Sequence, residues 1–156
     1  MAFADDLIEQ AYHLARRERT KLRQASLRRS VSTAYYALFH LLIREAVSNW
    51  RHGDHRAALA RAFDHGPMKK ASQRVIHGKF LGSPAPTVAH LKVVANAFIE
   101  LQEARHLADY DDSKQWSRTD ALKVVDQASA AFDAWRVIKG DKIAQDYLLQ
   151  LLVQRR

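Results

Sequence analysis

The chain has 156 residues, of which 47% are hydrophobic, and this length and composition suit one domain with an ordinary core. It contains no cysteine, which excludes disulfides and thiolate metal sites, and its longest apolar runs are too short to span a bilayer. A net charge of +8 favours acidic partners such as nucleic acid. The first ten residues are unlike a secretory signal, so we expect a cytoplasmic protein without a membrane segment.

The scarcity of helix breakers predicts an all-α fold. The chain has five glycines and three prolines, and no run alternates β-branched with polar residues. The first helix is expected over residues 4–19, because Leu7, Ala11 and Leu14 recur on one face. A second and longer helix is expected over residues 21–51, where no glycine or proline occurs.

Positive charge is concentrated around the first connection between helices. Glu18 is the one acidic residue in that stretch. The basic residues there are Arg16, Arg17, Arg19, Lys21, Arg23, Arg28 and Arg29. Such a surface either keeps the protein soluble or binds a polyanion, and the sequence leaves both interpretations open.

The middle of the chain contains the clearest breaks. Gly53 and Asp54 predict a stop and a new N-cap, after which the segment HRAALARAF begins a third helix. Gly66 and Pro67 predict an interruption, because proline does not continue an α-helix smoothly, and the helical pattern resumes over residues 68–76. Residues 78–86 are expected to form a loop.

Three further helices complete the predicted fold. The fourth covers residues 87–108, and the fifth covers residues 120–139 with Ser117 or Thr119 as its cap. The sixth, over residues 141–154, is expected to pack across the bundle or against a second subunit. The residues predicted to be buried are Leu91, Val94, Phe98 and Leu101 on the fourth helix, Val125, Ala128, Phe132 and Trp135 on the fifth, and Ile143, Tyr147, Leu148 and Leu151 on the sixth.

Polar side chains share one side of the second helix. Arg29, Thr33, Tyr36 and His40 are spaced so that they return to nearly the same face of an α-helix. Of the adjacent tyrosines Tyr35 and Tyr36, one is expected in the core, and spacing favours Tyr36 for the polar stripe. The stripe is therefore predicted to be a hydrogen-bonding surface, in which His40 can titrate near neutral pH.

The fourth predicted helix carries charge where its core pattern predicts apolar residues. The seam that contains Leu91 and Phe98 continues to Arg105, and Asp109 follows one turn later. Buried charge is costly unless it is paired. We therefore expect Arg105 and Asp109 to bind each other, a polar group on the second helix, or a ligand. A purely architectural ion pair is the alternative.

Two segments carry a resemblance to a known family. The segment LRRSVSTAYYALFHLL at residues 27–42 and the segment EARHLADYDDS at residues 103–113 resemble the HEPN domain superfamily, most closely its small stand-alone bacterial and archaeal branch. FDHG at residues 63–66 resembles the histidine-bearing break of that branch. The resemblance implies one domain, an up-and-down four-helix bundle over residues 5–138 with an accessory C-terminal helix over residues 141–154. It also implies a homodimer.

The resemblance also implies an association with RNA. Many members are metal-independent endoribonucleases of defence or toxin–antitoxin systems, in which an arginine is followed after four to six residues by a histidine. No histidine of this chain has an arginine at that spacing. The leading hypothesis is therefore a HEPN-like protein that binds RNA or nucleotide in such a system, without a metal or cofactor. The candidate binding residues are Arg28, Arg29, Thr33, Tyr36, His40, Arg105, Asp109 and Tyr110.

Two alternatives remain open from the sequence. The first is an active metal-independent endoribonuclease, with His40 or His65 as the proton-transfer group and Arg105 as the phosphate anchor. The second is a protein-interaction module that pairs with a nucleotidyltransferase, with an antitoxin or with a second copy of the chain.

Overall fold

The structure is a computed structural model that describes residues 2–153. Within this range every regular element is an α-helix, so the predicted all-α helical bundle is confirmed. The seven helices of the described range are α1 (Phe3–Ala15), α2 (Gln24–Val47), α3 (Gly53–Ala60), α4 (His65–His77), α5 (Ala85–Tyr110), α6 (Arg118–Ile138) and α7 (Lys142–Leu152).

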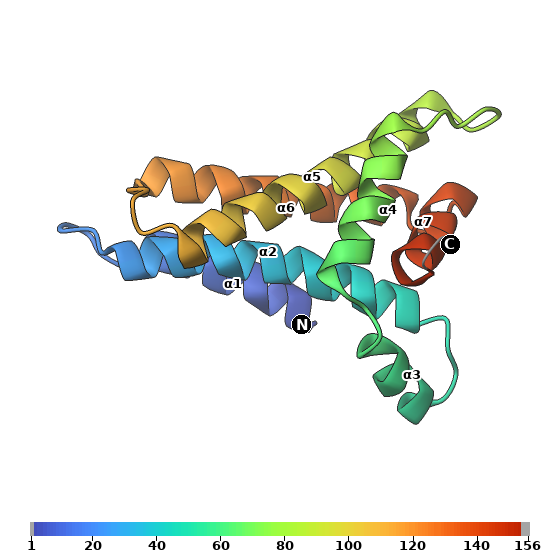
Figure 1. The fold of residues 1–156 in the computed structure, drawn as a ribbon, viewed down its shortest axis with the longest axis horizontal. Helices are drawn as coiled ribbons and strands as arrows, with labels where there is room; N and C mark the ends of the chain where they lie inside the picture. Colours follow the sequence, from blue (N-terminus) through green and yellow to red (C-terminus); the bar gives the residue numbers. More distant parts are fainter. Residues whose placement is uncertain (1, 154–156) are drawn as a thin grey trace.

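Four of the helices form an elongated bundle in which the chain direction alternates. Helices α1, α2, α5 and α6 run side by side, and α2 packs against the other three (Figure 1). The short helices α3 and α4 lie between α2 and α5 in the sequence, and α4 crosses the bundle to pack on α5 and α7. The α1–α2 and α5–α6 connections therefore share one end of the bundle, while α3 and α7 lie at the other (Figure 1).

The core is built from the apolar faces that the sequence predicts. On α5 and α6 every residue of the predicted stripes is buried, which confirms the helical phase of both segments. The bulkiest fully buried side chains are Trp135 of α6, Tyr35 of α2, Tyr147 of α7 and Phe98 of α5. Because these come from four helices, α7 belongs to the same packing unit as the bundle. None of the helices within residues 2–153 is both long enough and apolar enough to cross a membrane.

The first connection is longer than the sequence predicts. Helix α1 ends at Ala15 and α2 begins at Gln24, so residues 16–23 lie outside both helices. Like charges four residues apart on a helix repel each other, and this stretch of basic residues contains two such pairs. The stretch also contains Lys21, whose φ of 52° lies in the left-handed region and turns the chain. The predicted helix over residues 4–19 therefore extends too far, and α2 begins later than predicted.

The break before α4 also differs from the prediction. Helix α4 begins at His65, with Asp64 in the N-cap position, so Gly66 and Pro67 lie in its first turn and do not interrupt it. Backbone N–H groups in the first turn have no helical partner, so proline costs little there. The break falls over residues 61–64 instead, and as a result His65 is attached to the end of a helix.

Helix α7 packs within its own chain. It contacts α4 and α2, and its residues Tyr147, Leu148 and Leu151 are buried. The hydroxyl groups of Ser72 and Tyr147 form a buried hydrogen bond of 2.7 Å between α4 and α7. Of the two arrangements expected for this helix, packing across the bundle is the one observed. The predicted last residue of the helix, residue 154, lies outside the described residues.

Candidate functional site

A hydrogen bond between a buried tyrosine and a histidine lies at the centre of the candidate site. The Tyr35 hydroxyl is hydrogen-bonded to Nδ1 of His65, and the Tyr35 ring is fully buried in the bundle. The His65 ring also stacks on Phe39, with ring centroids 4.5 Å apart and planes inclined by 28°. These two contacts hold the imidazole in a defined orientation at the N-terminus of α4.

Arg105 of α5 places a positive charge beside this pair. Its guanidinium carbon lies 5.3 Å from the ring centroid of Tyr35 and 5.7 Å from that of Tyr36, within cation–π range. Its side chain is only 13% exposed, and its Nε atom is buried without a hydrogen-bond partner among the described residues. A guanidinium in this position is largely desolvated but retains an unused donor.

Asp109 connects Arg105 to α2. An ion pair joins the Arg105 guanidinium to the Asp109 carboxylate at 3.6 Å, and the Ser32 hydroxyl donates a hydrogen bond to the same carboxylate. The sequence left three partners open for Arg105 and Asp109, and two of them are present: the two residues pair with each other, and Asp109 also binds a polar group on α2. The aspartate is more exposed than the arginine, at 32% of its side-chain surface.

The electrostatic environment keeps both His65 and Tyr35 uncharged near neutral pH. Burial lowers the pKa of His65, the positive charge of Arg105 lowers it further, and Asp64 opposes these two effects. Burial raises the pKa of Tyr35 well above its ordinary value, although Arg105 partly offsets the rise. The site therefore presents a fixed positive charge, a neutral imidazole and a protonated phenol.

This arrangement is suited to binding an anion and to moving a proton. A planar guanidinium matches the oxygen atoms of a phosphate group. If Nδ1–H of His65 donates to the Tyr35 oxygen, Nε2 keeps a lone pair that can accept a proton. Among residues 2–153 no three His, Asp or Glu side chains converge in a way that would hold a metal ion.

A surface cavity adjoins Arg105. Its volume is about 460 Å³, and it lies between α4 and α5. The residues that line it are Lys69, Gln102, Glu103, Arg105, His106 and Leu107. Lys69 and Glu103 form an ion pair of 3.9 Å across it, from α4 to α5. The volume lies within the range of small-molecule sites, roughly 300–1,000 Å³.

The two adjacent arginines near the start of α2, Arg28 and Arg29, have different surroundings. Arg28 donates hydrogen bonds to the backbone carbonyls of Ala108, Asp111 and Lys114 at 3.0, 2.8 and 2.5 Å, so its side chain holds the end of α5 and the connection to α6. Arg29 is exposed to solvent. Of this pair, only Arg29 is free to contact a ligand.

The remaining candidates from the sequence do not all reach Arg105. The Thr33 hydroxyl donates to the Arg29 carbonyl within α2, while Tyr36 lies beneath the Arg105 guanidinium. His40 packs edge-on against Phe3 of α1 at 5.0 Å between ring centroids, and burial lowers its pKa.

Tyr110 lies beyond Arg105 at the end of α5. It is exposed, and its ring lies 5.0 Å from that of His106. The structure therefore brings Tyr36, Arg105, Asp109 and His65 together, and it places His40 against α1.

Two members of the site were missed from the sequence. Tyr35 was expected in the core, and its ring is buried there, but the hydrogen bond of its hydroxyl to His65 was not predicted. Ser32, which donates to Asp109, was not singled out. Tyr35 and Tyr36 follow Ser32 by three and four residues, so the three side chains lie on neighbouring turns of one face of α2, which packs against α5. This spacing is the signal in the sequence that could have identified Ser32.

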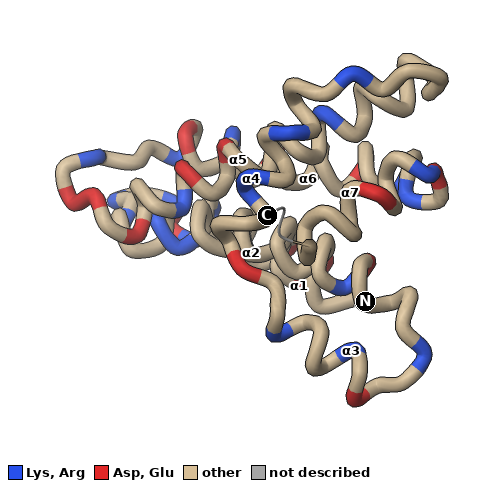
Figure 2. The backbone as a smooth tube through the Cα atoms, turned by 45° about the vertical axis from the view of Figure 1, so that its right-hand side comes forward, with Lys and Arg blue, Asp and Glu red and all other residues tan. Residues whose placement is uncertain are grey.

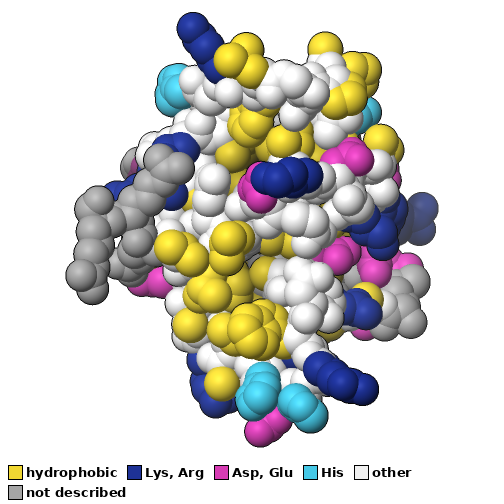
Figure 3. All heavy atoms as spheres, turned by 90° about the vertical axis from the view of Figure 1, so that its right-hand side faces the viewer, with side chains coloured by type: hydrophobic (Ala, Val, Ile, Leu, Met, Phe, Trp, Pro, Cys, Tyr) yellow, Lys and Arg dark blue, Asp and Glu magenta, His cyan; other side chains and the backbone are white. Residues whose placement is uncertain are grey.

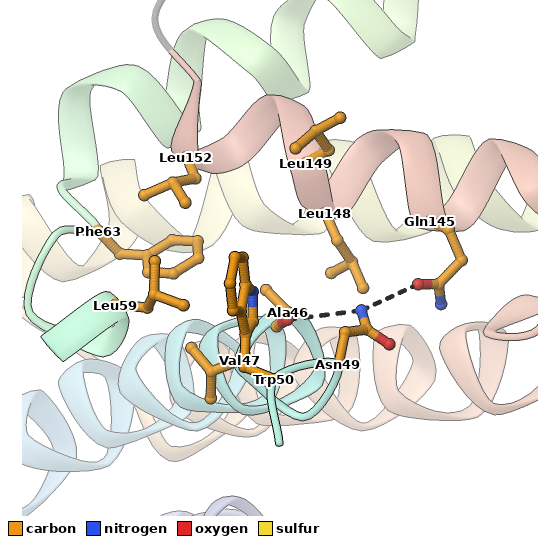
Figure 4. A pocket seen from close by; sticks show the side chains of 10 residues that line it. All are labelled: Ala46, Val47, Asn49, Trp50, Leu59, Phe63, Gln145, Leu148, Leu149 and Leu152. Atoms are coloured by element: carbon orange, nitrogen blue, oxygen red, sulfur yellow. Dashed lines mark hydrogen bonds between the residues drawn. The ribbon is translucent and has the colours of Figure 1, made fainter. Parts of the chain in front are cut away.

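A second cavity, of about 350 Å³, lies at the opposite end of the bundle between α2, α3 and α7 (Figure 4). In Figure 4 the ring of Trp50 faces Leu59 and Phe63, and the only polar side chains are those of Asn49 and Gln145, which are hydrogen-bonded at 3.2 Å. Hydrophobic side chains gather on this end of the molecule (Figure 3). Because no titratable side chain lines the cavity, it offers an apolar contact surface and no acid–base chemistry.

Comparison of the chain with family models, with curated proteins and with solved structures found no match.

Proposed function

We propose that this chain is a HEPN-like protein that binds RNA or nucleotide at Arg105. The observation that carries the proposal is the position of Arg105, whose guanidinium lies over Tyr35 and Tyr36 and whose side chain lines a surface cavity. Its Nε is buried and has no hydrogen-bond partner among the described residues. A desolvated guanidinium binds phosphate strongly because its donors match two phosphate oxygens. The net charge of +8 adds long-range attraction for a polyanion.

The biological setting of the proposal comes from the resemblance. The segments at residues 27–42 and 103–113, which resemble HEPN domains, contribute Ser32, Tyr35, Tyr36, Arg105 and Asp109 to the site. The two segments that carry the resemblance thus supply residues that surround the charged group. A defence or toxin–antitoxin role is proposed on this basis.

Substitution of Arg105 tests the proposal. We expect Arg105→Gln to weaken the binding of a short single-stranded RNA and of a nucleoside monophosphate by about tenfold or more, which corresponds to roughly 1.4 kcal/mol. Arg51→Gln is the matched control, since Arg51 is an exposed arginine in the connection between α2 and α3. Binding is measured by fluorescence anisotropy and calorimetry at two salt concentrations, with circular dichroism as a check on folding. If Arg105→Gln binds RNA and the nucleotide as tightly as the wild type does, Arg105 is not part of the binding site.

A metal-independent endoribonuclease is the second candidate function. The favouring observation is geometric: Arg105 lies over the ring of Tyr35, whose hydroxyl is hydrogen-bonded to His65, although His65 and Arg105 are forty positions apart in the chain. The positive charge of Arg105 also lowers the pKa of His65. In this reading His65 Nε2 takes the proton of a 2′-hydroxyl while the 2′-oxygen attacks phosphorus. Arg105 stabilises the phosphorane charge, and water protonates the departing 5′-oxygen.

Paired histidine substitutions test this second function. Cleavage of RNA in the presence of EDTA should be lost in His65→Asn and retained in His40→Asn, because His40 packs against α1. If neither the wild type nor His40→Asn cleaves RNA, the enzyme reading is rejected while the binding proposal stands. If His65→Asn cleaves as fast as the wild type, another group transfers the proton.

Self-association is the third candidate. The favouring observation is the apolar cavity between α2, α3 and α7, beside which Trp50 is 51% exposed and Leu149 is 62% exposed. We propose that a second copy of the chain covers this face as a homodimer, and the resemblance offers a nucleotidyltransferase or an antitoxin as the alternative partner. Sedimentation equilibrium should show a dimer for the wild type and a monomer for the Trp50→Gln, Leu149→Gln variant. A monomeric wild type would reject the homodimer.

A further inference from the structure

The connection between α1 and α2 is a dense basic surface. Each of its arginines and its one lysine is exposed, and Arg29, within the second turn of α2, is exposed as well. The cations of this surface, called here the basic connection, are Arg17, Arg19, Lys21, Arg23 and Arg29. Within residues 2–153, none of them forms an ion pair. Arg16 differs, since its guanidinium lies 5.1 Å from the ring centroid of Tyr12.

Hydrogen bonds fix the backbone and the one acidic side chain of this connection. The Arg118 side chain donates to the carbonyl of Ala15 at 3.1 Å and to that of Glu18. The Glu18 carboxylate accepts a hydrogen bond from Ser26 at 2.7 Å, so it is directed toward α2. The single acid of the connection is thus engaged, and the surrounding cations are left to solvent or to an external anion.

The basic connection and the Arg105 site lie along the same half of α2. Arg28 bonds to the carbonyls of Ala108 and Asp111, which brings the end of α5 beside the start of α2. The distance along α2 from Arg23 to Tyr36, at 1.5 Å per residue, is about 20 Å. A stacked nucleic-acid strand advances about 3.4 Å per nucleotide, so about six nucleotides cover this distance.

We propose that the basic connection binds the phosphate backbone of a single RNA strand whose other part occupies the Arg105 site. This inference rests on the proposed function and deepens it, because it names the ligand as a strand of about six nucleotides or more instead of a mononucleotide. Several unpaired cations spaced along one path contact successive phosphates, which is how electrostatic grooves hold single strands.

The neighbouring acidic residues favour a strand over a membrane surface. Asp111 and Asp112 of the α5–α6 connection lie at the same end of the bundle, and Figure 2 shows acidic positions beside the basic ones there. A flat anionic membrane would meet both connections at once, whereas a strand can follow the basic one alone. In the basic connection only Leu22 is a large apolar residue, so little is available to insert into lipid.

Two charge-matched variants test the inference. The first changes Arg17, Arg19, Lys21 and Arg23 to Gln in the basic connection. The control changes Arg51, Arg61, Lys79 and Lys139 to Gln, which removes the same charge from exposed positions at the opposite end of the bundle. Each protein is titrated with a labelled single-stranded RNA of about 12 nucleotides, with adenosine monophosphate and with phosphatidylserine vesicles, across a range of salt concentrations.

The RNA and mononucleotide arms have distinct expected results. The basic-connection variant should bind the RNA about tenfold or more weakly at low salt, and its log–log salt slope should be less negative by up to about 3. The control variant should bind the RNA nearly as the wild type does. Adenosine monophosphate should bind all three proteins alike, because it reaches only the Arg105 site.

Several outcomes would overturn the inference. Equal loss of RNA affinity in both variants would mean that the net charge of the protein, and not the position of the cations, determines binding. No loss of affinity in either variant would mean that the basic connection does not bind RNA. Vesicle binding that is lost in the basic-connection variant, without RNA binding, would reassign the surface to a membrane. If the wild type binds neither RNA nor adenosine monophosphate, the proposed function fails together with this inference. If the wild type binds adenosine monophosphate but the basic-connection variant binds RNA as tightly as the wild type does, only the role of the basic connection is rejected.

Discussion

The hydroxyl of Tyr35, in the middle of α2, is hydrogen-bonded to Nδ1 of His65, the first residue of α4. Thirty positions separate the two residues in the chain, and α3 lies between them. The bond fixes the start of α4 on the bundle and orients the His65 imidazole beside the Tyr35 ring, over which Arg105 lies. The same hydrogen bond therefore contributes to the stability of the fold and positions a side chain of the candidate site.

Removal of the Tyr35 hydroxyl should destabilise the protein modestly. Tyr35→Phe keeps the buried ring and leaves His65 Nδ1 without its partner, so we expect a loss of about 0.5–1.5 kcal/mol in the free energy of unfolding. Urea denaturation followed by circular dichroism measures the loss. Tyr36→Phe is the control, because the Tyr36 hydroxyl makes no hydrogen bond among the described residues. Similar losses in the two variants would mean that the bond to His65 adds no stability.

Stability should fall when the solution is acidified through the histidine range. Burial lowers the pKa of both His65 and His40 in the folded state, so below the ordinary histidine pKa of 6.5 the unfolded chain binds more protons than the folded one. The stabilisation is complete above that value and is lost as pH falls through the folded-state pKa. Denaturation measured from about pH 7 to pH 5 should show the decline, and His40→Gln, His65→Gln should flatten it. An unchanged decline in this double variant would assign it to other groups.

Arg28 and Arg29 should differ sharply although they are adjacent. Arg28→Ala removes a charged donor from the carbonyls of Ala108, Asp111 and Lys114, and we expect a loss of about 2 kcal/mol or more. Arg29→Ala removes an exposed side chain and should change stability by less than about 0.5 kcal/mol. Thermal and urea denaturation of the two variants make the comparison. A small effect of Arg28→Ala would show that solvent replaces its hydrogen bonds at no cost.

Helix α7 should be an integral part of the fold. Tyr147→Ala removes a fully buried ring and its hydrogen bond to Ser72, and such truncations cost about 3–5 kcal/mol. Leu149→Ala changes an exposed residue of the same helix and should be nearly neutral. The free energies of unfolding of the two variants give the test. A small effect of Tyr147→Ala would mean that α7 is dispensable and accessory to the bundle.

Much of the fold follows from the sequence because helix formation is local. The apolar stripes of α5 and α6 repeat at helical spacing, and each predicted residue of these stripes is buried. Ser117 was predicted as a possible cap of α6, and its side chain accepts a hydrogen bond from the backbone N–H of Asp120 in a capping box. Each of these features depends on residues only a few positions apart.

The tertiary structure alone decided which polar groups meet. The spacing on α2 identified Tyr36, yet the depth of Tyr35 and its bond to His65 depend on where α4 crosses the bundle. Arg28 and Arg29 look alike in the sequence, and only the position of the α5–α6 connection makes one of them structural. The sequence determined the helices and their apolar faces, because these follow from local periodicity. The pairing of Tyr35 with His65, and of Arg105 with Asp109 and Ser32, was set by the rotation and register of helices packed against one another.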